Sequence, residues 1–324
     1  MAAPTNALTQ LTSIGRREDL SDVISRVQPE KTPLFSTIKK GKATNLRSEW
    51  QIESLATPAV NAQLEGDDVG TLGAANVTTR VSNICQIFSK TGAVARSTEV
   101  ATHAGRSSEM ARQKAVKMVE LKRDIEFSML SNSASRVESG SNARLSAGIR
   151  AWCTTNSSLG ATGANGGFNT STSIVDAATP GTARTFTEAL LKGVAQTRFT
   201  AAGDATKLIC YMSPNSKQLA SAFTGISAQR KESGDTAATT RIIGGADIYA
   251  SDFGDIVFVP HAYAFSSTNA AVLVDPDYAE WAWFDGVKST DLAKTGDADK
   301  FLMTGEGTLK VTNERAHAVI HALS

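Results

Sequence analysis

The chain has 324 residues, and its 33 Lys and Arg against 32 Asp and Glu give a formal net charge of +1. This balance argues against a dedicated nucleic-acid-binding protein, whose affinity would come from a strongly basic face. The length suits two lobes, or one large domain with an arm. Only 6% of the residues are aromatic and 20% are charged. Such a chain spreads little apolar surface over many elements, so we expect neighbouring subunits to complete its core.

The cysteines and the apolar runs indicate the cellular compartment in which the chain is expected. The chain contains three cysteines, Cys85, Cys153 and Cys210, which lie far apart and form no CxxC pair. We therefore expect neither a disulfide framework nor a thiolate zinc site, and a reducing compartment suits the chain. The first fifteen residues contain no basic residue and no continuous apolar run, so no secretory signal is expected. Apolar runs such as 270–274 are far shorter than the roughly 18 residues of a spanning helix, so no membrane partner is predicted.

The N-terminal part of the chain has the pattern of an arm. Residues 16–26 place apolar side chains at helical spacing among charges, which predicts a short amphipathic helix ended by Pro29. Residues 28–42 are polar, with a basic end, apart from Leu34 and Phe35. An apolar pair in a polar arm requires a partner surface, so this pair is a predicted intersubunit contact.

Two alternating segments predict the strands of a long hairpin. In residues 47–53, Trp50 and Ile52 alternate with polar side chains, which is typical of a half-buried strand. A second alternating run covers residues 77–87. A lone two-stranded hairpin is marginally stable in water, so this one must lie on another surface. Trp50 and Ile52 are therefore predicted intersubunit contacts.

The tip of this hairpin is rich in glycine and acidic. Glu65, Asp67 and Asp68 lie close together between the two strands. We expect these three carboxylates to contact a basic patch of a neighbouring subunit. The alternative is a solvated turn, because a surface ion pair contributes only about 0–1 kcal/mol.

The strongest helical periodicity lies in residues 99–132. Glu120 with Arg123, and Lys122 with Glu126, are expected to form supporting pairs on the solvent side, and Gly105 to bend or break the start. The apolar stripe consists of Met110, Ala111, Ala115, Met118, Leu121, Ile125 and Met129. Some 25 residues at 1.5 Å each predict a helix of about 35–40 Å that acts as a structural beam.

The remaining segments predict an α+β fold. Residues 133–183 are expected to form an ordered loop region with short strands. Helices are expected at 185–198 and 214–223, strands at 208–212, 248–249, 256–259, 271–274 and 281–284, and a strand within 308–323 that closes the sheet. Helices and strands mix without a regular βαβ rhythm, which disfavours a doubly wound sheet.

No segment predicts catalysis. His317 and His321 are four residues apart, but the surrounding sequence reads as a strand and lacks the zincin glutamate, so we interpret them as a solvated pair. The acidic pairs in 275–277 and 297–299 lack the spacing of a calcium-binding loop and are interpreted as solvated turns. No nucleophile elbow, dinucleotide-binding loop or phosphate-binding loop is present. We therefore predict no enzyme, no cofactor and no metal.

Several stretches, in order along nearly the whole chain, resemble one known family. They are SDVISRVQPEKTPLFSTIKK (21–40), EW (49–50), LEG (64–66), AGRSSEMARQKAVKMVELKRDIEFSMLSN (104–132), GTARTFTEALLKGVAQ (181–196), SDFGD (251–255) and LAKTGDADK (292–300). The chain resembles the major capsid (major head) proteins of tailed bacteriophages, which have the HK-ninety-seven-type fold shared with herpesvirus capsids and encapsulin shells. In particular, it is similar to a phage major head protein family catalogued as a domain of unknown function.

The resemblance implies a division of the chain. Residues 1–46 would be the N-terminal arm, and 47–97 the extended hairpin loop. Residues 98–184 would form the peripheral domain with its spine helix, and 185–286 the axial domain. Residues 287–324 would return to the peripheral domain and end in the C-terminal strand.

The resemblance also implies the function and the partners. The chain would assemble with itself into hexamers and pentamers of an icosahedral shell around packaged double-stranded DNA, which it contacts non-specifically. It would be assembled in the bacterial host cytoplasm and reside in the virion. A separate scaffolding protein, a portal and a decoration protein are further expected partners. The alternatives are an encapsulin-like cellular shell protein and, from another class, an α+β hydrolase.

Overall fold

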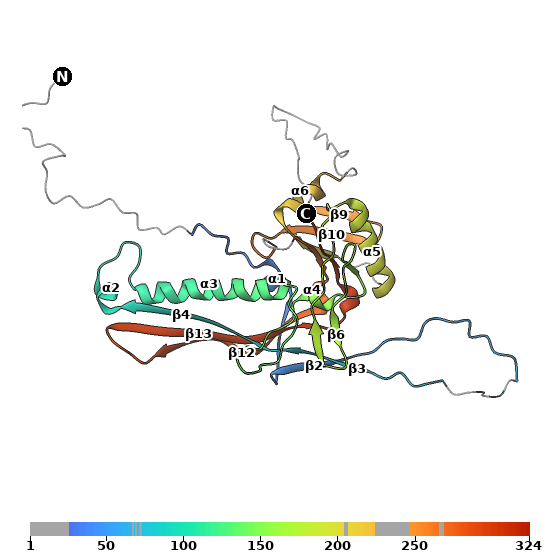
Figure 1. Cartoon of the computed structure of the whole chain (residues 1–324), viewed down its shortest axis with the longest axis horizontal. Coiled ribbons are helices and arrows are strands. Elements are labelled where there is room, and N and C mark those ends of the chain that lie inside the picture. Colours follow the sequence, from blue (N-terminus) through green and yellow to red (C-terminus); the bar gives the residue numbers. More distant parts are fainter. Residues whose placement is uncertain are drawn as a thin grey trace, which may run out of the picture.

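The structure is a computed structural model that describes residues 26–66, 68, 70, 73–203, 207–223, 247–265 and 269–324. The helix predicted for residues 16–26 lies outside the described residues except for Arg26, and so does Asp67. The described chain has an elongated lobe and a compact lobe (Figure 1).

Two sheets organise these lobes. The elongated lobe contains a four-stranded sheet in the order β1 (Lys39–Lys42), β12 (Ala279–Leu292), β13 (Ala298–Val311) and β4 (Gln86–Ala95). The compact lobe contains a six-stranded sheet in the order β5 (Ser157–Ser158), β14 (Ala318–Ile320), β11 (Ala271–Val274), β8 (Leu208–Met212), β10 (Gly254–Pro260) and β9 (Ile248–Ser251). Two-stranded sheets form from β2 (Arg47–Ile52) with β3 (Thr79–Ile84), and from β6 (Gly167–Asn169) with β7 (Ile174–Asp176). The helices are α1 (Pro33–Thr37), α2 (Arg96–Val100), α3 (Glu109–Leu130), α4 (Ile149–Trp152), α5 (Glu188–Ala202) and α6 (Pro214–Ser221), with 3₁₀ turns η1 (Pro276–Tyr278) and η2 (Glu314–Ala316).

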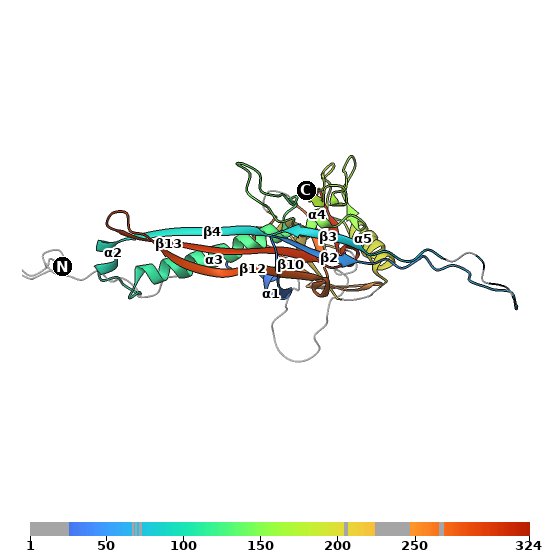
Figure 2. The same ribbon diagram turned by 90° about the horizontal axis from the view of Figure 1, so that it is seen from below.

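The long helix α3 confirms the predicted beam, although it begins later than predicted. Gly105 adopts a positive φ of 71°, which separates α2 from α3. Ser108 then caps α3, because its side chain accepts a hydrogen bond from the backbone N–H of Ala111. The helix has 22 residues, or about 33 Å at 1.5 Å per residue. It lies along the four-stranded sheet (Figure 2).

Only the C-terminal half of the predicted apolar stripe is buried. Leu121, Ile125 and Met129 are at most 1% exposed in the core, whereas Ala111 and Ala115 are exposed. The predicted solvent-side position of Glu126 is wrong, since its side chain is fully buried. A carboxylate in the core requires hydrogen-bond donors, and these come from the N-terminal arm, as described below.

The six-stranded sheet is covered on both faces. Along β11, Val272 and Val274 belong to the core cluster that contains α3, whereas Leu273 belongs to a second cluster with residues of α5 such as Leu191. This alternation follows from the two-residue period of a strand. Helix α5 begins at its Thr187 cap and ends at Gly203, which adopts a φ of 70°.

The strands β12 and β13 form a long hairpin that the sequence did not predict in full. Residues 281–284 were predicted as a strand, but β12 continues to Leu292 and pairs with β13 along nearly its whole length. The missed part of β12 is exposed and polar, so it has no apolar alternation. The single C-terminal strand predicted within 308–323 is also wrong. The segment is divided by η2, and only β14 enters the six-stranded sheet.

The observed sheets do not follow the predicted domain limits. Strand β12 runs through the limit between residues 286 and 287, and β14 pairs inside the compact lobe. Strand β4 lies within the predicted loop 47–97 but belongs to the four-stranded sheet. The C-terminal segment therefore contributes to both lobes.

Candidate assembly surfaces

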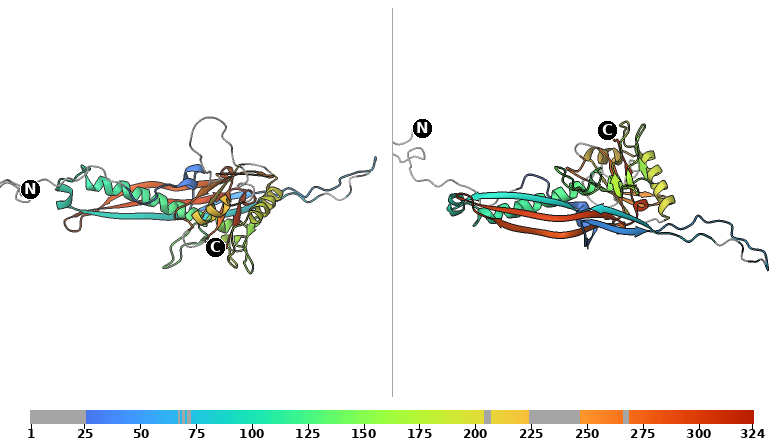
Figure 3. Two further views of the ribbon diagram at one scale, coloured as in Figure 1. Left: turned by 90° about the horizontal axis from the view of Figure 1, so that it is seen from above. Right: turned by 60° about the horizontal axis from the view of Figure 1, so that its bottom comes forward.

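The predicted extended loop is present and projects from the body of the subunit. Strands β2 and β3 pair antiparallel from Arg47 with Ile84 to Ile52 with Thr79. The chain between them leaves the body as two unpaired arms (Figures 1 and 3). Within the described part of this segment, the large apolar side chains are almost fully exposed. They are Leu55 (88%), Val60 (97%), Leu64 (80%) and Val77 (83%).

The part of the extended loop between β2 and β3, residues 53–78, carries charge of a single sign. Residues 53–78 contain Glu53, Glu65, Asp67 and Asp68 and no Lys or Arg. Glu65 and Asp68 are exposed, and Asp67 lies outside the described residues. When a partner covers the exposed leucine and valine side chains of this loop, the burial of apolar surface favours association.

The root of the loop is fixed to the subunit's own core. The buried Asn83 side chain donates to the carbonyls of Ala147 and Leu309 at 3.2 and 2.7 Å and accepts from the Ala147 N–H at 3.0 Å. Trp50 packs against Trp152, with ring centroids 5.4 Å apart. Trp50 thus has a partner within its own subunit, while Ile52 at the end of β2 is 37% exposed. The root is held rigidly, and the part beyond Ile52 is available for contact.

Leu34 of the arm, which was expected to need a partner surface, finds that surface in its own subunit. Its side chain is 1% exposed within the subunit's own core. Phe35 packs edge-on against Trp281 and Trp283, at centroid distances of 6.4 and 6.2 Å, and Lys40 lies over its ring. The arm returns to its own core here, and so the reason for expecting an intersubunit contact at this pair no longer applies.

A buried carboxylate holds the arm in this position. The backbone N–H groups of Leu34 and Phe35 donate to the two oxygens of Glu126 at 2.8 and 2.6 Å. The ring of His261 lies 3.2 Å from the same carboxylate. Helix α3, the arm and the segment after β10 therefore meet at one buried side chain.

Replacing Glu126 with glutamine is expected to lower the free energy of unfolding by about 1–3 kcal/mol, since an amide presents only one acceptor oxygen to two backbone donors. Hydrogen exchange at Leu34 and Phe35 should accelerate in the same variant. Thermal unfolding and exchange mass spectrometry measure both effects. The matched control is Glu120→Gln on the same helix, which removes a partly exposed pair with Lys117. Equal behaviour of the two variants would contradict the role of Glu126.

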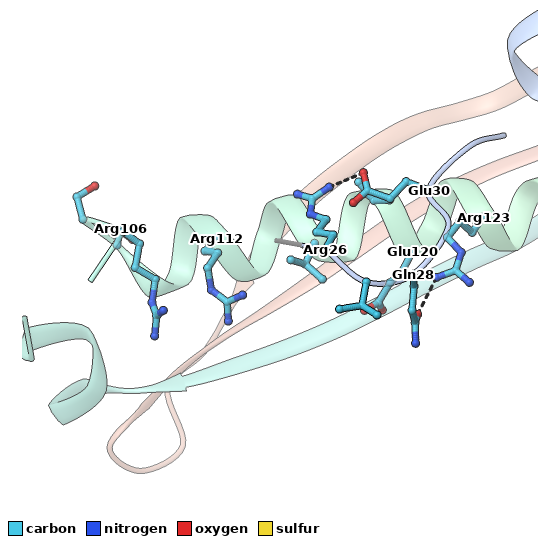
Figure 4. Close-up of a pocket in the computed structure, with 13 residues that line it drawn as sticks. Arg26, Gln28, Glu30, Arg106, Arg112, Glu120 and Arg123 are labelled. Carbon is cyan, nitrogen blue, oxygen red and sulfur yellow. Dashed lines mark hydrogen bonds and ion pairs between the residues drawn. The ribbon is translucent and has the colours of Figure 1, made fainter. Parts of the chain in front are cut away.

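A groove lies between the arm and the N-terminal half of α3 (Figure 4). Its volume is about 740 Å³. Arg26 pairs with Glu30 at 2.8 Å, and Arg123 donates to Gln28 at 3.2 Å. The groove is lined by Arg26, Val27, Gln28, Glu30, Gly105, Arg106, Ser107, Ser108, Arg112, Val116, Val119, Glu120 and Arg123.

Glu109 organises the arginines at one end of the groove. It forms ion pairs with Arg106 and with Arg112, the latter at 2.7 Å. Hydrogen bonds, first from Arg112 and then from Gln113, lower the pKa of Glu109 to about 2. The carboxylate therefore stays ionised at neutral pH and keeps both guanidinium groups in place.

The titratable residues considered for catalysis are packed in the interior. His317 and His321 are fully buried, so the predicted solvated pair is wrong. Asp275, predicted in a solvated turn, is 1% exposed and pairs with Arg198 at 3.1 Å. Within the described part of the chain, no group of three His, Cys, Asp or Glu side chains could hold a metal ion. None of the described helices is both long and apolar enough to cross a membrane.

The buried histidines predict a dependence of stability on pH. Burial lowers the pKa of His317 to about 4 and that of His321 to about 3, from 6.5. Below pH 6.5 the unfolded chain binds protons that the folded chain does not, so stability is complete above pH 6.5 and falls as the pH drops toward these values. Between pH 6.5 and pH 5, each histidine should lower the free energy of unfolding by about 2 kcal/mol.

Urea unfolding of the subunit at pH 7 and pH 5 measures this dependence. In His321→Gln the loss between the two pH values should be smaller by about 2 kcal/mol than in the wild type. A variant that retained the full pH dependence would contradict the assignment. Because the difference between two pH values is compared, a general weakening of the variant does not affect the result.

The fold is that of phage capsid and encapsulin subunits, as two phage structures and one encapsulin structure show. The cyanophage A-1(L) capsid asymmetric unit matches with a TM-score of 0.67 at 14% identity, over 98% of this chain and 99% of that chain. The cyanophage Pam1 capsid asymmetric unit matches with a TM-score of 0.60 at 11% identity, over 99% of each chain. The SrpI encapsulin of Synechococcus elongatus PCC 7942 matches with a TM-score of 0.56 at 10% identity, over 98% and 96%.

A family model identifies the chain more closely. The model described as SU10 major capsid protein matches residues 3–324, nearly the whole chain. The chain therefore belongs to the SU10 major capsid protein family, and the predicted resemblance to tailed-phage major capsid proteins is confirmed. It is a structural subunit of a virion capsid. A search of curated protein sequences returns no match.

Proposed function

We propose that this major capsid protein assembles with itself into hexamers and pentamers of an icosahedral shell that encloses packaged double-stranded DNA. The observation that supports this proposal is the extended loop, whose leucine and valine side chains, where the structure describes them, are 80–97% exposed in the single subunit. Closed shells of identical subunits provide a neighbour for each such loop. Assembly would take place in the bacterial host cytoplasm.

Further roles belong to the same proposal. The net charge of +1 lets identical subunits approach closely without strong repulsion. Contact with the enclosed DNA would be non-specific. A scaffolding protein, a portal and a decoration protein would be partners in assembly. We propose no catalytic activity, and turnover of a substrate by the unassembled subunit would favour a hydrolase instead.

The acidic loop tip should strengthen assembly. Glu65→Lys with Asp68→Lys is expected to leave the subunit folded but to lower the yield or heat resistance of shells, and high salt should weaken wild-type shells in the same direction. Light scattering at several salt concentrations measures yield, and circular dichroism confirms folding. Glu138→Lys, an exposed change away from the loop, is the control. Wild-type yield and heat resistance in the double variant would refute the tip contact but not the shell.

An encapsulin-like shell around a protein cargo is the second candidate, supported by the fold match to SrpI encapsulin. The contents of particles made during infection separate the two candidates. Nuclease-protected double-stranded DNA inside the particles supports the phage capsid. Particles that hold an enzyme and no DNA support the encapsulin-like shell.

A further inference from the structure

An exposed asparagine at the start of the β6–β7 hairpin is followed by a residue that favours a spontaneous reaction of the backbone. Asn165 is the only asparagine in the chain with a glycine directly after it. It lies just before β6, and its side chain is exposed to water. Since Gly166 has no side chain, its backbone nitrogen can approach the side-chain amide of Asn165 with little steric hindrance.

The fold requires glycine at position 166. A Cβ atom there would lie 2.2 Å from the carbonyl oxygen of Asp176 and 2.6 Å from the backbone nitrogen of Ala178. Real Cβ atoms do not approach backbone atoms this closely, so any other residue would push the two strands of the hairpin apart. Close packing of the hairpin therefore places a glycine directly after an exposed asparagine.

We propose that Asn165 and Gly166 form a site of spontaneous deamidation. Hydroxide removes the proton of the Gly166 N–H, and the nitrogen attacks the side-chain carbonyl carbon of Asn165. The amide group of Asn165 takes a proton from water and leaves as ammonia, which regenerates the hydroxide and closes a succinimide ring. Water then opens the ring at either carbonyl. One opening gives aspartate, and the other gives isoaspartate, whose backbone is one carbon longer.

The longer backbone does not fit between the neighbouring pairs of the hairpin. Ala164 and Thr179 exchange two backbone hydrogen bonds, at 3.0 and 2.8 Å. Gly167 pairs with Asp176 at the start of β6. Two residues on each strand separate these pairs, so an additional backbone carbon on one strand alone breaks the match between them.

The same hairpin holds the root of the extended loop, beside which it lies in Figure 1. In the turn of the hairpin, the carbonyl oxygen of Ser173 accepts hydrogen bonds from Arg47 of β2 at 3.2 Å and from Ser82 of β3 at 3.1 Å. Phe168 of β6 stacks on Trp152, with ring centroids 6.1 Å apart and planes 3° apart. Isoaspartate before β6 therefore loosens the contacts that hold β2 and β3 to the body of the subunit.

Peptide mass spectrometry of the folded wild-type subunit tests the site. Trypsin releases residues 151–184 as one peptide, which contains Asn156, Asn165 and Asn169. After incubation at pH 7 and at pH 9, electron-transfer fragmentation locates the gain of about 1 Da and identifies isoaspartate. We expect Asn165 to react several-fold faster than Asn169, and faster at pH 9, after subtraction of an unincubated sample. A rate no greater than that of Asn169, or reaction only in urea, would overturn the inference.

Hydrogen exchange measures the structural effect with two matched variants. In incubated wild type, exchange in residues 81–84 and 168–176 should rise several-fold in the fraction that contains isoaspartate. Incubated Asn165→Gln should show no rise, because its longer side chain closes the corresponding ring far more slowly. Fresh Asn165→Asp adds the charge without the extra carbon and should also match fresh wild type. Unchanged exchange in the isoaspartate fraction would overturn the loosening of the root. The unassembled subunit suffices, so neither result depends on the proposed shell.

Discussion

Replacement of Asp275 by asparagine is expected to lower the free energy of unfolding of the subunit by about 3–5 kcal/mol. Asp275 and Arg198 pair at 3.1 Å, and both side chains are 1% exposed. The substitution removes the negative charge opposite a guanidinium that has no access to bulk water, and the desolvation cost of that guanidinium remains. Asparagine retains a side-chain oxygen that can still accept the hydrogen bond from the Asp277 N–H at the start of η1. The loss of stability therefore measures the contribution of the Asp275 charge.

Chemical denaturation of the unassembled subunit measures the change. The control is Asp277→Asn, two residues away, which removes an exposed pair with Lys39 at 3.0 Å. That variant should lose at most about 1 kcal/mol. Similar losses in the two variants would show that the buried pair contributes no more than a surface pair.

Replacement of Leu121 by alanine is expected to lower the free energy of unfolding by about 2–5 kcal/mol, because it leaves a cavity in a close-packed core. The Leu121 side chain is 0% exposed in the cluster that joins α3 to both sheets. Leu121→Asp should prevent stable folding, and hence shell formation. The control is Leu292→Ala at the exposed end of β12, where the side chain is 41% exposed. An unchanged thermal transition and particle yield in Leu121→Asp would contradict the observed packing of α3.

The sequence predicted those elements whose local pattern is strong. The fully apolar strands β8 and β11 begin and end where predicted, and the alternating strands β2 and β3 form the predicted hairpin. The outer half of β12 was not predicted. Its side chains are mostly exposed, so this part of the strand lacks the alternation of apolar and polar residues on which the prediction of strands depends.

The buried polar residues show where local pattern fails. Glu126, Asp275 and His317 were expected in solvent, since charged and imidazole side chains are usually exposed. Each is buried because a distant segment supplies its partner: the arm for Glu126, α5 for Asp275, and the Asp275 N–H for the Nδ1 of His317. Such partners are separated by tens of residues, and spacing along the chain cannot reveal them.

The candidate assembly surface was predicted in part. The acidic and apolar composition of the loop is visible in the sequence. The groove is not visible there, because Val27 of the arm and Val119 of α3 line it together only after the arm folds back along the helix. Arg106 precedes α3 and Arg112 lies on it, and nothing in the sequence distinguishes them from ordinary solvent-exposed charges.

Electron cryomicroscopy of the purified, assembled protein tests the central claim most directly. We expect closed icosahedral particles built of six-fold and five-fold capsomers, in which each extended loop lies on a neighbouring subunit. A protein that remains monomeric at every concentration and salt tested, with or without a scaffolding protein, would contradict the assignment of this chain as a shell-forming capsid subunit.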